Sequence, residues 1–424
     1  MEKQKRWNRP PQIKRIFFDD FSEGVRTEVW RALNEKWSSQ HNNGYSEDNC
    51  LYTADPASVA AEGAHGGLVI IRSNGDFSAE EGRKRQGGGI VTKELFGPGL
   101  YETRVKAVPR AGQCSAMWTY YNNWAPKAEE RRYSEIDVEL PHGGDYRRWS
   151  GTTYENYMSG DEMVSRSEVI YSRSPLNDGK WHTLAFEWRT DAANGDEAVV
   201  WYQDGREVLR LCEAVPHYTA TFWVASLFQD AIAWLGDPQF ETAYMYVDWV
   251  KITEYTDPVQ PGNAEKESGF SFTGKNIGAS PVPKTDYLAN AFFSRPAKTA
   301  NFKGREITSW EIEGGAIENG ALRLANGRAG QFIAAQYAGF SFETEVRGRA
   351  QGEVRVYLEY LAGEANRTDP VLEPVGKSGV LTLGKGETSL KGVWKIEEAR
   401  TEHIRFVVEA DGEAVIEEAH LRLV

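Results

Sequence analysis

The chain has 424 residues and carries a formal net charge of −13, and 12% of its residues are aromatic, including 14 tryptophans. This length allows about two or three domains, each with its own core. The acidic balance argues against nucleic acid and anionic membranes as partners, because both attract basic surfaces, and it suits a neutral partner such as a glycan.

The first residues, 1–15, are basic and polar and lack the apolar segment of a signal peptide. No stretch reaches the roughly 18 apolar residues of a transmembrane helix. The sequence therefore leaves open both a cytoplasmic protein and a secreted protein whose signal was removed. The three cysteines, Cys50, Cys114 and Cys212, have neither a disulfide-framework nor a metal-site spacing, and their pairing stays open.

Short runs of aromatic and β-branched residues bounded by Gly, Pro, Asp or Asn dominate residues 14–256, which is typical of β-strands. Helical periodicity is nearly absent. The Asp204-Gly205 pair predicts a tight turn between two strands, because this pair tolerates positive φ. These strands predict a large sandwich of two stacked sheets. The predicted strands are Gly67–Arg72, Gly99–Ala107, Tyr133–Leu140, Trp181–Arg189, Ala198–Leu211 and Tyr244–Glu254.

The composition changes after residue 256, because twelve of the 14 tryptophans precede Asp257. Residues 257–285 are rich in Pro, Gly, Ser and Lys and predict a linker, a loosely ordered connection. Residues 286–424 again alternate apolar and polar positions, which predicts a smaller second β-sandwich. Within it, Asp411-Gly412 predicts the turn of a long hairpin.

The segment YSEIDVEL, Tyr133–Leu140, contains the pattern that carries chemistry. Side chains alternate along a strand, so Glu135, Asp137 and Glu139 share one face. Three adjacent carboxylates repel one another and are poor strand formers, so the pattern indicates a use. A solvated strand face or a calcium site are the alternatives.

Glycoside hydrolysis requires one carboxylate nucleophile and one carboxylic acid, and crowding raises the pKa of one member of such a group. On a flat strand Cα atoms four residues apart lie roughly 13 Å from each other, whereas retaining enzymes need carboxyl groups at about 5–5.5 Å. We therefore expect Glu135 and Glu139 to lean together on the concave face of a curved sheet.

The sequence EIDVE resembles the E-x-D-x-E signature of glycoside hydrolase family 16, in the form without an extra bulge residue that is found in bacterial lichenases. Three further segments, in the same order, resemble that family, and the resemblance spans about residues 16–254. They are LFGPGLYETRVKA (Leu95–Ala107), WHTLAFEW (Trp181–Trp188) and LFQDAIAWLGDPQFETAYMYVDWVKIT (Leu227–Thr253).

The resemblance implies an all-β, concanavalin-like β-jelly-roll sandwich with a cleft on its concave face. It implies Glu135 as nucleophile, Asp137 as the assisting carboxylate and Glu139 as general acid/base of a retaining mechanism, without a metal or organic cofactor in the chemistry. A structural calcium ion, known in some members, is not indicated. We expect a monomer with a polysaccharide substrate, and family habit favours an extracellular or periplasmic location.

The resemblance also suggests substrate-binding residues. Trp234 matches a lichenase tryptophan that lines the cleft, and Tyr133 and Phe228 stand where lichenases carry tryptophan. Tyr154 follows on the next strand, and Asn43 resembles a substrate-binding asparagine. His142 and Arg147 could reach the cleft edge, where a sulfated or acidic sugar would bind. The alternative for each aromatic residue is core packing.

The segment Ser309–Gly327 resembles the start of jelly-roll carbohydrate-binding modules, so the second domain is either such a module or a structural domain docked on the first. Its candidate sugar platforms are Trp310, Tyr337, Tyr357, Tyr360 and Trp394.

The leading hypothesis is an endo-acting retaining glycanase on a β-1,3-1,4- or β-1,3-glucan. A red-algal galactan (agarose, porphyran, carrageenan or furcellaran) is the alternative substrate, because the altered cleft aromatics leave the sugar open. A glycan-binding protein without activity is the alternative outside the enzymes.

Overall fold

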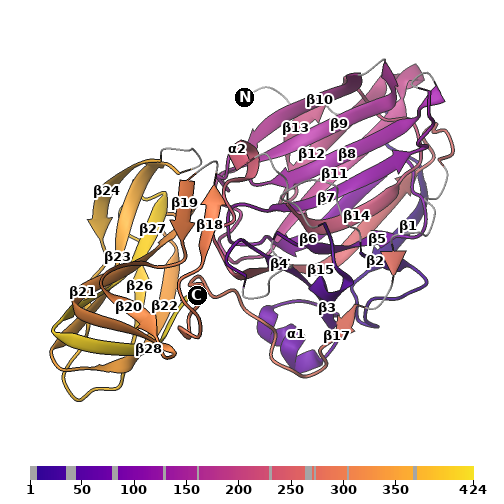
Figure 1. Cartoon of the computed structure of the whole chain (residues 1–424). Coiled ribbons are helices and arrows are strands. Elements are labelled where there is room, and N and C mark those ends of the chain that lie inside the picture. Colours follow the sequence, from indigo (N-terminus) through magenta and orange to yellow (C-terminus); the bar gives the residue numbers. More distant parts are fainter. Residues whose placement is uncertain are drawn as a thin grey trace.

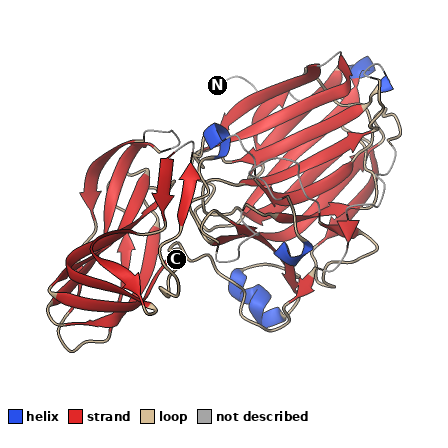
Figure 2. Ribbon diagram, in the orientation of Figure 1, coloured by secondary structure: helices blue, strands red, loops and turns tan. Residues whose placement is uncertain are grey.

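The computed structural model describes residues 7–34, 44–78, 85–127, 130–159, 162–228, 232–262, 270–271, 274–302, 305–365 and 370–424. Strands dominate these residues and helices are few and short (Figure 2). The predicted all-β class is confirmed. In the described residues no helix has the length and apolar character needed to cross a membrane.

The first domain consists of two stacked sheets (Figure 1). One has nine strands, with β1 (Ile13–Asp19) paired to β15 beside the main order. That order is β13 (Arg206–Leu211), β12 (Asp196–Gln203), β11 (His182–Asp191), β6 (Gly99–Lys106), β15 (Thr242–Tyr255), β4 (Leu68–Asn74), β3 (Cys50–Thr53) and β17 (Lys275–Asn276).

The other sheet has eight strands and contains the carboxylate-rich segment in its interior. Its order is β10 (Glu162–Tyr171), β9 (Arg148–Ser159), β8 (Tyr133–Leu140), β7 (Cys114–Asn122), β14 (Thr221–Leu227), β5 (Gly88–Thr92), β2 (Trp30–Leu33) and β16 (Phe270–Ser271).

The core of the first domain lies between these sheets, because each strand turns alternate apolar residues inward. Trp149, Trp188 and Trp201 are fully buried there, and burial of each such side chain contributes about 1.5–3 kcal/mol or more. The predicted turn between β12 and β13 is confirmed, with positive φ at both Asp204 and Gly205.

The short helices occupy connections between strands. Helix α1 (Pro56–Glu62) begins after Asp55, whose side chain accepts the Ser58 N–H, and ends at Gly63 in a left-handed conformation. Within the described ranges, further helical segments are η1 (Glu47–Asn49), η3 (Ala192–Asn194) and α2 (Ile232–Leu235). All three cysteines are unpaired; Cys50 and Cys114 are buried and Cys212 is exposed.

The segment predicted to be a loose linker is attached to the first domain along its described residues. Asp257 forms a buried ion pair with Arg189, at 2.5 Å. Further along, β16 and β17 extend one sheet each, by pairing with β2 and β3. The Tyr246 hydroxyl donates to the Pro283 carbonyl oxygen at 2.6 Å. The high proline and glycine content of this segment therefore corresponds to an irregular backbone whose described residues pair with both sheets of the first domain.

The second domain contains a nine-stranded sheet and a two-stranded ribbon, β18 (Thr299–Phe302) with β19 (Arg305–Thr308). The sheet curls, because β25 pairs with β23 yet also contacts β26 at the opposite end. The order is β24 (Val371–Lys377), β23 (Glu353–Glu364), β27 (His403–Asp411), β21 (Ala321–Ile333), β28 (Glu413–Leu423), β22 (Ser341–Ala350) and β26 (Ser389–Lys395), with β20 (Glu311–Glu318) on β21 and β25 (Leu381–Leu383) on β23.

The predicted hairpin at Asp411-Gly412 is wrong. Strand β21 lies between β27 and β28, pairing with β28 through its first half and with β27 through its second half. Gly412 exchanges hydrogen bonds with Asn326 of β21 instead. The Asp411-Gly412 sequence therefore specifies only the local turn. The strand that pairs with both β27 and β28 is β21, which comes earlier in the chain.

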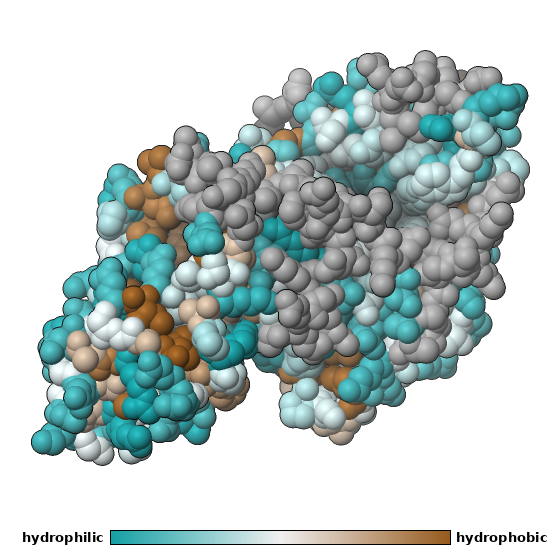
Figure 3. Space-filling model, in the orientation of Figure 1, coloured by the Kyte–Doolittle hydropathy of each residue, from teal (hydrophilic) through white to brown (hydrophobic). Residues whose placement is uncertain are grey.

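Most of the predicted sugar platforms of the second domain are internal. Trp310, Tyr360 and Trp394 are buried, and Trp310 and Trp394 donate their indole N–H groups to backbone carbonyls. Tyr337 is buried against the first domain. Only Tyr357, of the five, is half-buried on the surface. On the face shown in Figure 3, the described residues are mainly hydrophilic, with apolar patches on the second domain.

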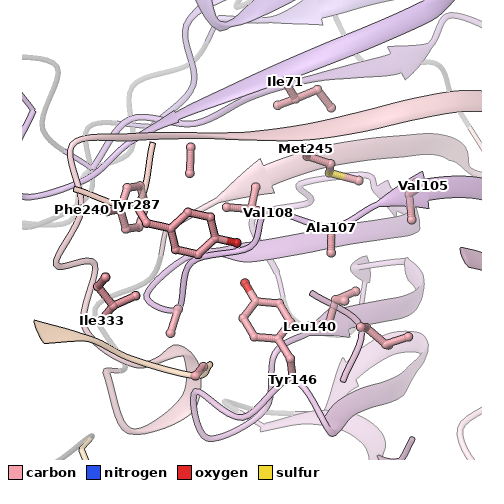
Figure 4. Close-up of a cluster of buried hydrophobic side chains, with 14 of the residues drawn as sticks. Ile71, Val105, Ala107, Val108, Leu140, Tyr146, Phe240, Met245, Tyr287 and Ile333 are labelled. Atoms are coloured by element: carbon pink, nitrogen blue, oxygen red, sulfur yellow. The ribbon is translucent and has the colours of Figure 1, made fainter. Parts of the chain in front are cut away.

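The two domains share one continuous apolar cluster. Figure 4 shows Tyr146 and Phe240 of the first domain in this cluster, together with Tyr287 and Ile333 of the C-terminal part. The buried guanidinium of Arg110 donates to the backbone oxygens of Tyr287 (2.5 Å) and Gln239 (2.7 Å). The second domain is therefore packed firmly onto the first.

Candidate active site

The carboxylate triplet lies on β8, which is flanked by β7 and β9 in the interior of the eight-stranded sheet. Ile136, Val138 and Leu140 point into the sandwich core and are at most 2% exposed. Glu135, Asp137 and Glu139 alternate with them and share the opposite side. We call this outward side of the sheet the carboxylate face.

Glu135 has two hydrogen-bonding neighbours on its own strand. The Tyr133 hydroxyl and the Asp137 carboxyl group both hydrogen-bond to its side chain. Burial raises the pKa of Glu135 to about 7, and these two hydrogen bonds oppose the rise because they favour the ionised form. Burial and the charges of both glutamates raise the pKa of Asp137 well above its usual range, so Asp137 is the protonated donor.

Glu139 holds its proton more tightly than Glu135. Burial, followed by the negative charge of Glu135, raises the pKa of Glu139 to about 8. Burial therefore raises the pKa of both carboxyl groups into the neutral range, where the coupled pair can hold one proton between them. This pair supplies a nucleophile and an acid together.

Aromatic residues that the sequence did not single out cover much of the carboxylate face. Trp118 of β7 lies directly opposite Asp137 in the strand register, and Trp223 of β14 lies opposite Trp118. Their rings stack at 5.2 Å between centroids. The Tyr120 ring meets Trp223 edge-on. The alternation of Trp118 and Tyr120 in a β-type segment was the available signal, but their face follows only from the pairing with β8.

Three of the predicted substrate-binding residues lie at this face. Tyr133 is buried and meets Tyr120 and Tyr154 edge-on, with centroids at 5.5 and 5.8 Å. Tyr154 lies opposite Glu135 in the register and is half-buried. Trp234, on α2, packs against the aromatic cluster that contains Trp118 and is also half-buried.

His142 lies beyond the end of β8, half-buried. Its Nδ1 is 2.9 Å from the Ser150 hydroxyl, and Ser150 is the register partner of Glu139. Burial and the nearby Arg148 lower the pKa of His142, so its ring is neutral near pH 7. His142 therefore lies at the edge of the carboxylate face, at the end where Glu139 is.

Two predicted substrate-binding residues lie elsewhere. Phe228, which follows β14 directly, is 1% exposed in the core and stacks on Phe240. Arg147 faces the second domain, where it pairs with Glu402 at 2.7 Å, and it also pairs with Asp145 of its own turn at 2.9 Å. Asn43 lies outside the described residues. Among the residues that the structure describes, no His, Cys, Asp and Glu cluster is arranged to hold a metal ion.

An all-β sandwich with two such carboxyl groups on one sheet face is an arrangement suited to a glycoside hydrolase. A family model described as "Glycosyl hydrolases family 16" matches residues 40–251, which is half of the chain. The chain belongs to this family and is a glycoside hydrolase.

Several curated relatives are named beta-glucanase. One from Brevibacillus brevis is 26% identical over 257 residues, covering 56% of this chain and 90% of that protein. One from Bacillus subtilis is 24% identical over 246 residues, covering 56% and 86%. One from Acetivibrio thermocellus is 28% identical over 169 residues, covering 40% and 43%. The solved structure of Bacillus licheniformis beta-glucanase is 18% identical, covers 56% of this chain and 98% of that chain, and has a TM-score of 0.43.

Proposed function

We propose that this protein is an endo-acting, retaining β-glucanase that cleaves a β-1,3-1,4- or β-1,3-linked glucan. The observation that carries the proposal is the geometry of β8, which places Glu135, Asp137 and Glu139 on one side of the eight-stranded sheet. The beta-glucanase relatives favour a glucan as the polymer. The half-buried rings of Tyr154 and Trp234 at the carboxylate face offer apolar surfaces for sugar rings.

The reaction follows in two displacements. Glu139 donates its proton to the glycosidic oxygen while a Glu135 carboxylate oxygen attacks the anomeric carbon. The bond to the leaving sugar breaks and a glycosyl ester on Glu135 forms. Glu139, now ionised, removes a proton from a water molecule that attacks the same carbon and releases Glu135. Two inversions leave the β configuration unchanged.

Asp137 has an assisting role in this scheme. Its protonated carboxyl group hydrogen-bonds to Glu135, which orients the nucleophile and favours its ionised form before the first displacement and as Glu135 leaves in the second. Burial of Asp137 keeps this proton in place near neutral pH.

A polysaccharide panel tests the substrate. We expect barley β-glucan or laminarin to be cut to short oligosaccharides, with internal cleavage seen as an early fall in polymer size. Hydrolysis of agarose or carrageenan alone would instead establish a galactan hydrolase. Binding of glucan without any hydrolysis would establish a glycan-binding protein.

Substitutions test the roles. Glu135→Gln should lower kcat at least about a thousand-fold, equivalent to about 4 kcal/mol of barrier, whereas Glu168→Gln, at a half-buried glutamate on β10, should stay near wild type. Azide should restore turnover of an activated aryl glycoside by Glu139→Ala and yield a β-glycosyl azide. An α-configured product from the wild-type protein would refute retention.

A further inference from the structure

The turn that follows the catalytic strand, residues 141–148, is held from the second domain. The Tyr337 hydroxyl donates a hydrogen bond to the Asp145 carboxylate at 2.9 Å and accepts one from the Tyr146 backbone N–H at 3.0 Å. Tyr337 is 5% exposed, so water does not readily replace these bonds.

Neighbouring contacts reinforce this attachment. The Arg147 guanidinium lies over the Tyr337 ring, 4.9 Å from its centroid, and donates to Glu402 at 2.7 Å. Against the effect of burial, hydrogen bonds from Arg147 and Tyr337 hold the pKa of Asp145 below its usual range. The Asp145 carboxylate is therefore ionised, and it links the turn to Tyr337 of the second domain.

The same turn reaches the carboxylate face on its other side. His142 contacts the Ser150 hydroxyl, the register partner of Glu139. The Gly144 N–H donates to the Trp234 carbonyl oxygen at 3.1 Å. Internal hydrogen bonds, including His142 N–H to the Arg148 oxygen at 2.9 Å, make the turn one compact unit.

We infer that Tyr337 is a positioning residue for the reaction: through the turn 141–148 it fixes the surroundings of Glu139 and the placement of Trp234. The second domain thus completes the Glu139 end of the site, acting through contacts that do not touch the substrate. This inference rests on the proposed function, in which Glu139 is the general acid/base.

Loosening the turn has a defined consequence for the acid. Burial is the main reason for the high pKa of Glu139, so admitting water beside Ser150 lowers that pKa. The general acid must be protonated, and the alkaline limb of the activity profile then moves to lower pH. Among the residues that the structure describes, the other titratable groups around Glu139 are Glu135, Asp137, Cys114, Tyr154 and, through Ser150, His142.

The test compares Tyr337→Phe with Tyr357→Phe in the full chain. Both remove one hydroxyl, but that of Tyr357 contacts Glu409 on the sheet of the second domain. For Tyr337→Phe we expect faster hydrogen–deuterium exchange in residues 141–150 and a kcat lowered about tenfold with little change in KM. The alkaline limb should also move to lower pH. Tyr357→Phe should change none of these.

The outcomes separate clearly. Unchanged exchange would overturn the attachment, and faster exchange with an unmoved alkaline limb and kcat would overturn the positioning role. Glu402→Gln, which weakens the same attachment from another side chain, decides the matter if Tyr337→Phe does not fold. A wild-type protein inactive on every polysaccharide would refute the proposed function instead, and the exchange result would still test the attachment.

Discussion

Removing the Tyr133 hydroxyl tests the proton arrangement of the site directly. This hydroxyl donates to Glu135 and is one of two hydrogen bonds that favour the ionised carboxylate. In Tyr133→Phe the pKa of Glu135 should therefore rise above about 7. Since Glu135 must be ionised to attack, the acid limb of the kcat/KM profile should move to higher pH.

The size of the shift follows from the bond that is lost. A hydrogen bond to a charged group contributes about 1.5–3 kcal/mol, and one pKa unit corresponds to about 1.4 kcal/mol. We expect a shift of about one unit, because water partly replaces the hydroxyl. At pH 6 kcat/KM should fall about tenfold, while at pH 9, where Glu139 limits the rate, it should stay within about twofold.

The assay is kcat/KM from pH 5 to pH 10 on a soluble glucan oligosaccharide. Tyr154→Phe is the matched control, because its hydroxyl forms no hydrogen bond with the described residues although its ring lies opposite Glu135. The control can change the height of the profile but should leave the acid limb in place. An unmoved acid limb in Tyr133→Phe, or an equal movement of both limbs, would refute the assignment of the lower pKa to Glu135.

Three further predictions concern stability. Phe228→Ala should cost about 3–5 kcal/mol of unfolding free energy through a core cavity and leave KM unchanged, whereas Ala at the exposed Phe292 should cost under about 0.5 kcal/mol; a raised KM with normal stability would return Phe228 to the substrate. Although burial opposes it, the hydrogen bonds that the His182 imidazolium donates to Asp178 and Asp204 raise its pKa to about 9, so the stabilisation from these bonds is full below about pH 6.5 and disappears as pH rises through about 9. Denaturant titrations should show His182→Gln less stable than wild type by about 3 kcal/mol at pH 6 and nearly equal at pH 10, and an equal gap at both pH values would contradict the charge assignment. A chain ending at Thr256 should unfold at least about 10 °C lower in a thermal melt, since it exposes the shared apolar cluster, and an unchanged melting temperature would show the domains to be independent.

Local sequence patterns predicted the elements that depend on neighbouring residues. The strand Tyr133–Leu140 and its alternation follow from period-two patterning, and the structure has the same bounds. The turn at Asp204-Gly205 follows from the backbone freedom of that pair. The all-β class and the family resemblance were likewise available from short segments.

Features that depend on distant partners could not be predicted. Arg147 looked like an edge residue of the site, but its partner Glu402 is 255 positions away. Phe228 follows a predicted strand, but its contact with Phe240 in the core could not be inferred from the residues around it. Trp118 belongs to the carboxylate face through the pairing of β7 with β8, and Trp223 through its pairing with β7 across more than 100 residues.

The shared core also limits how this enzyme can be recombined. Arg110 and Tyr146 are buried by residues of the C-terminal part. A chimera that replaces the second domain with an unrelated module would therefore remove the partners of the Arg110 guanidinium and expose an apolar surface to solvent. Domain shuffling, in evolution or in the laboratory, would have to transfer the docking loops of the first domain together with the second domain.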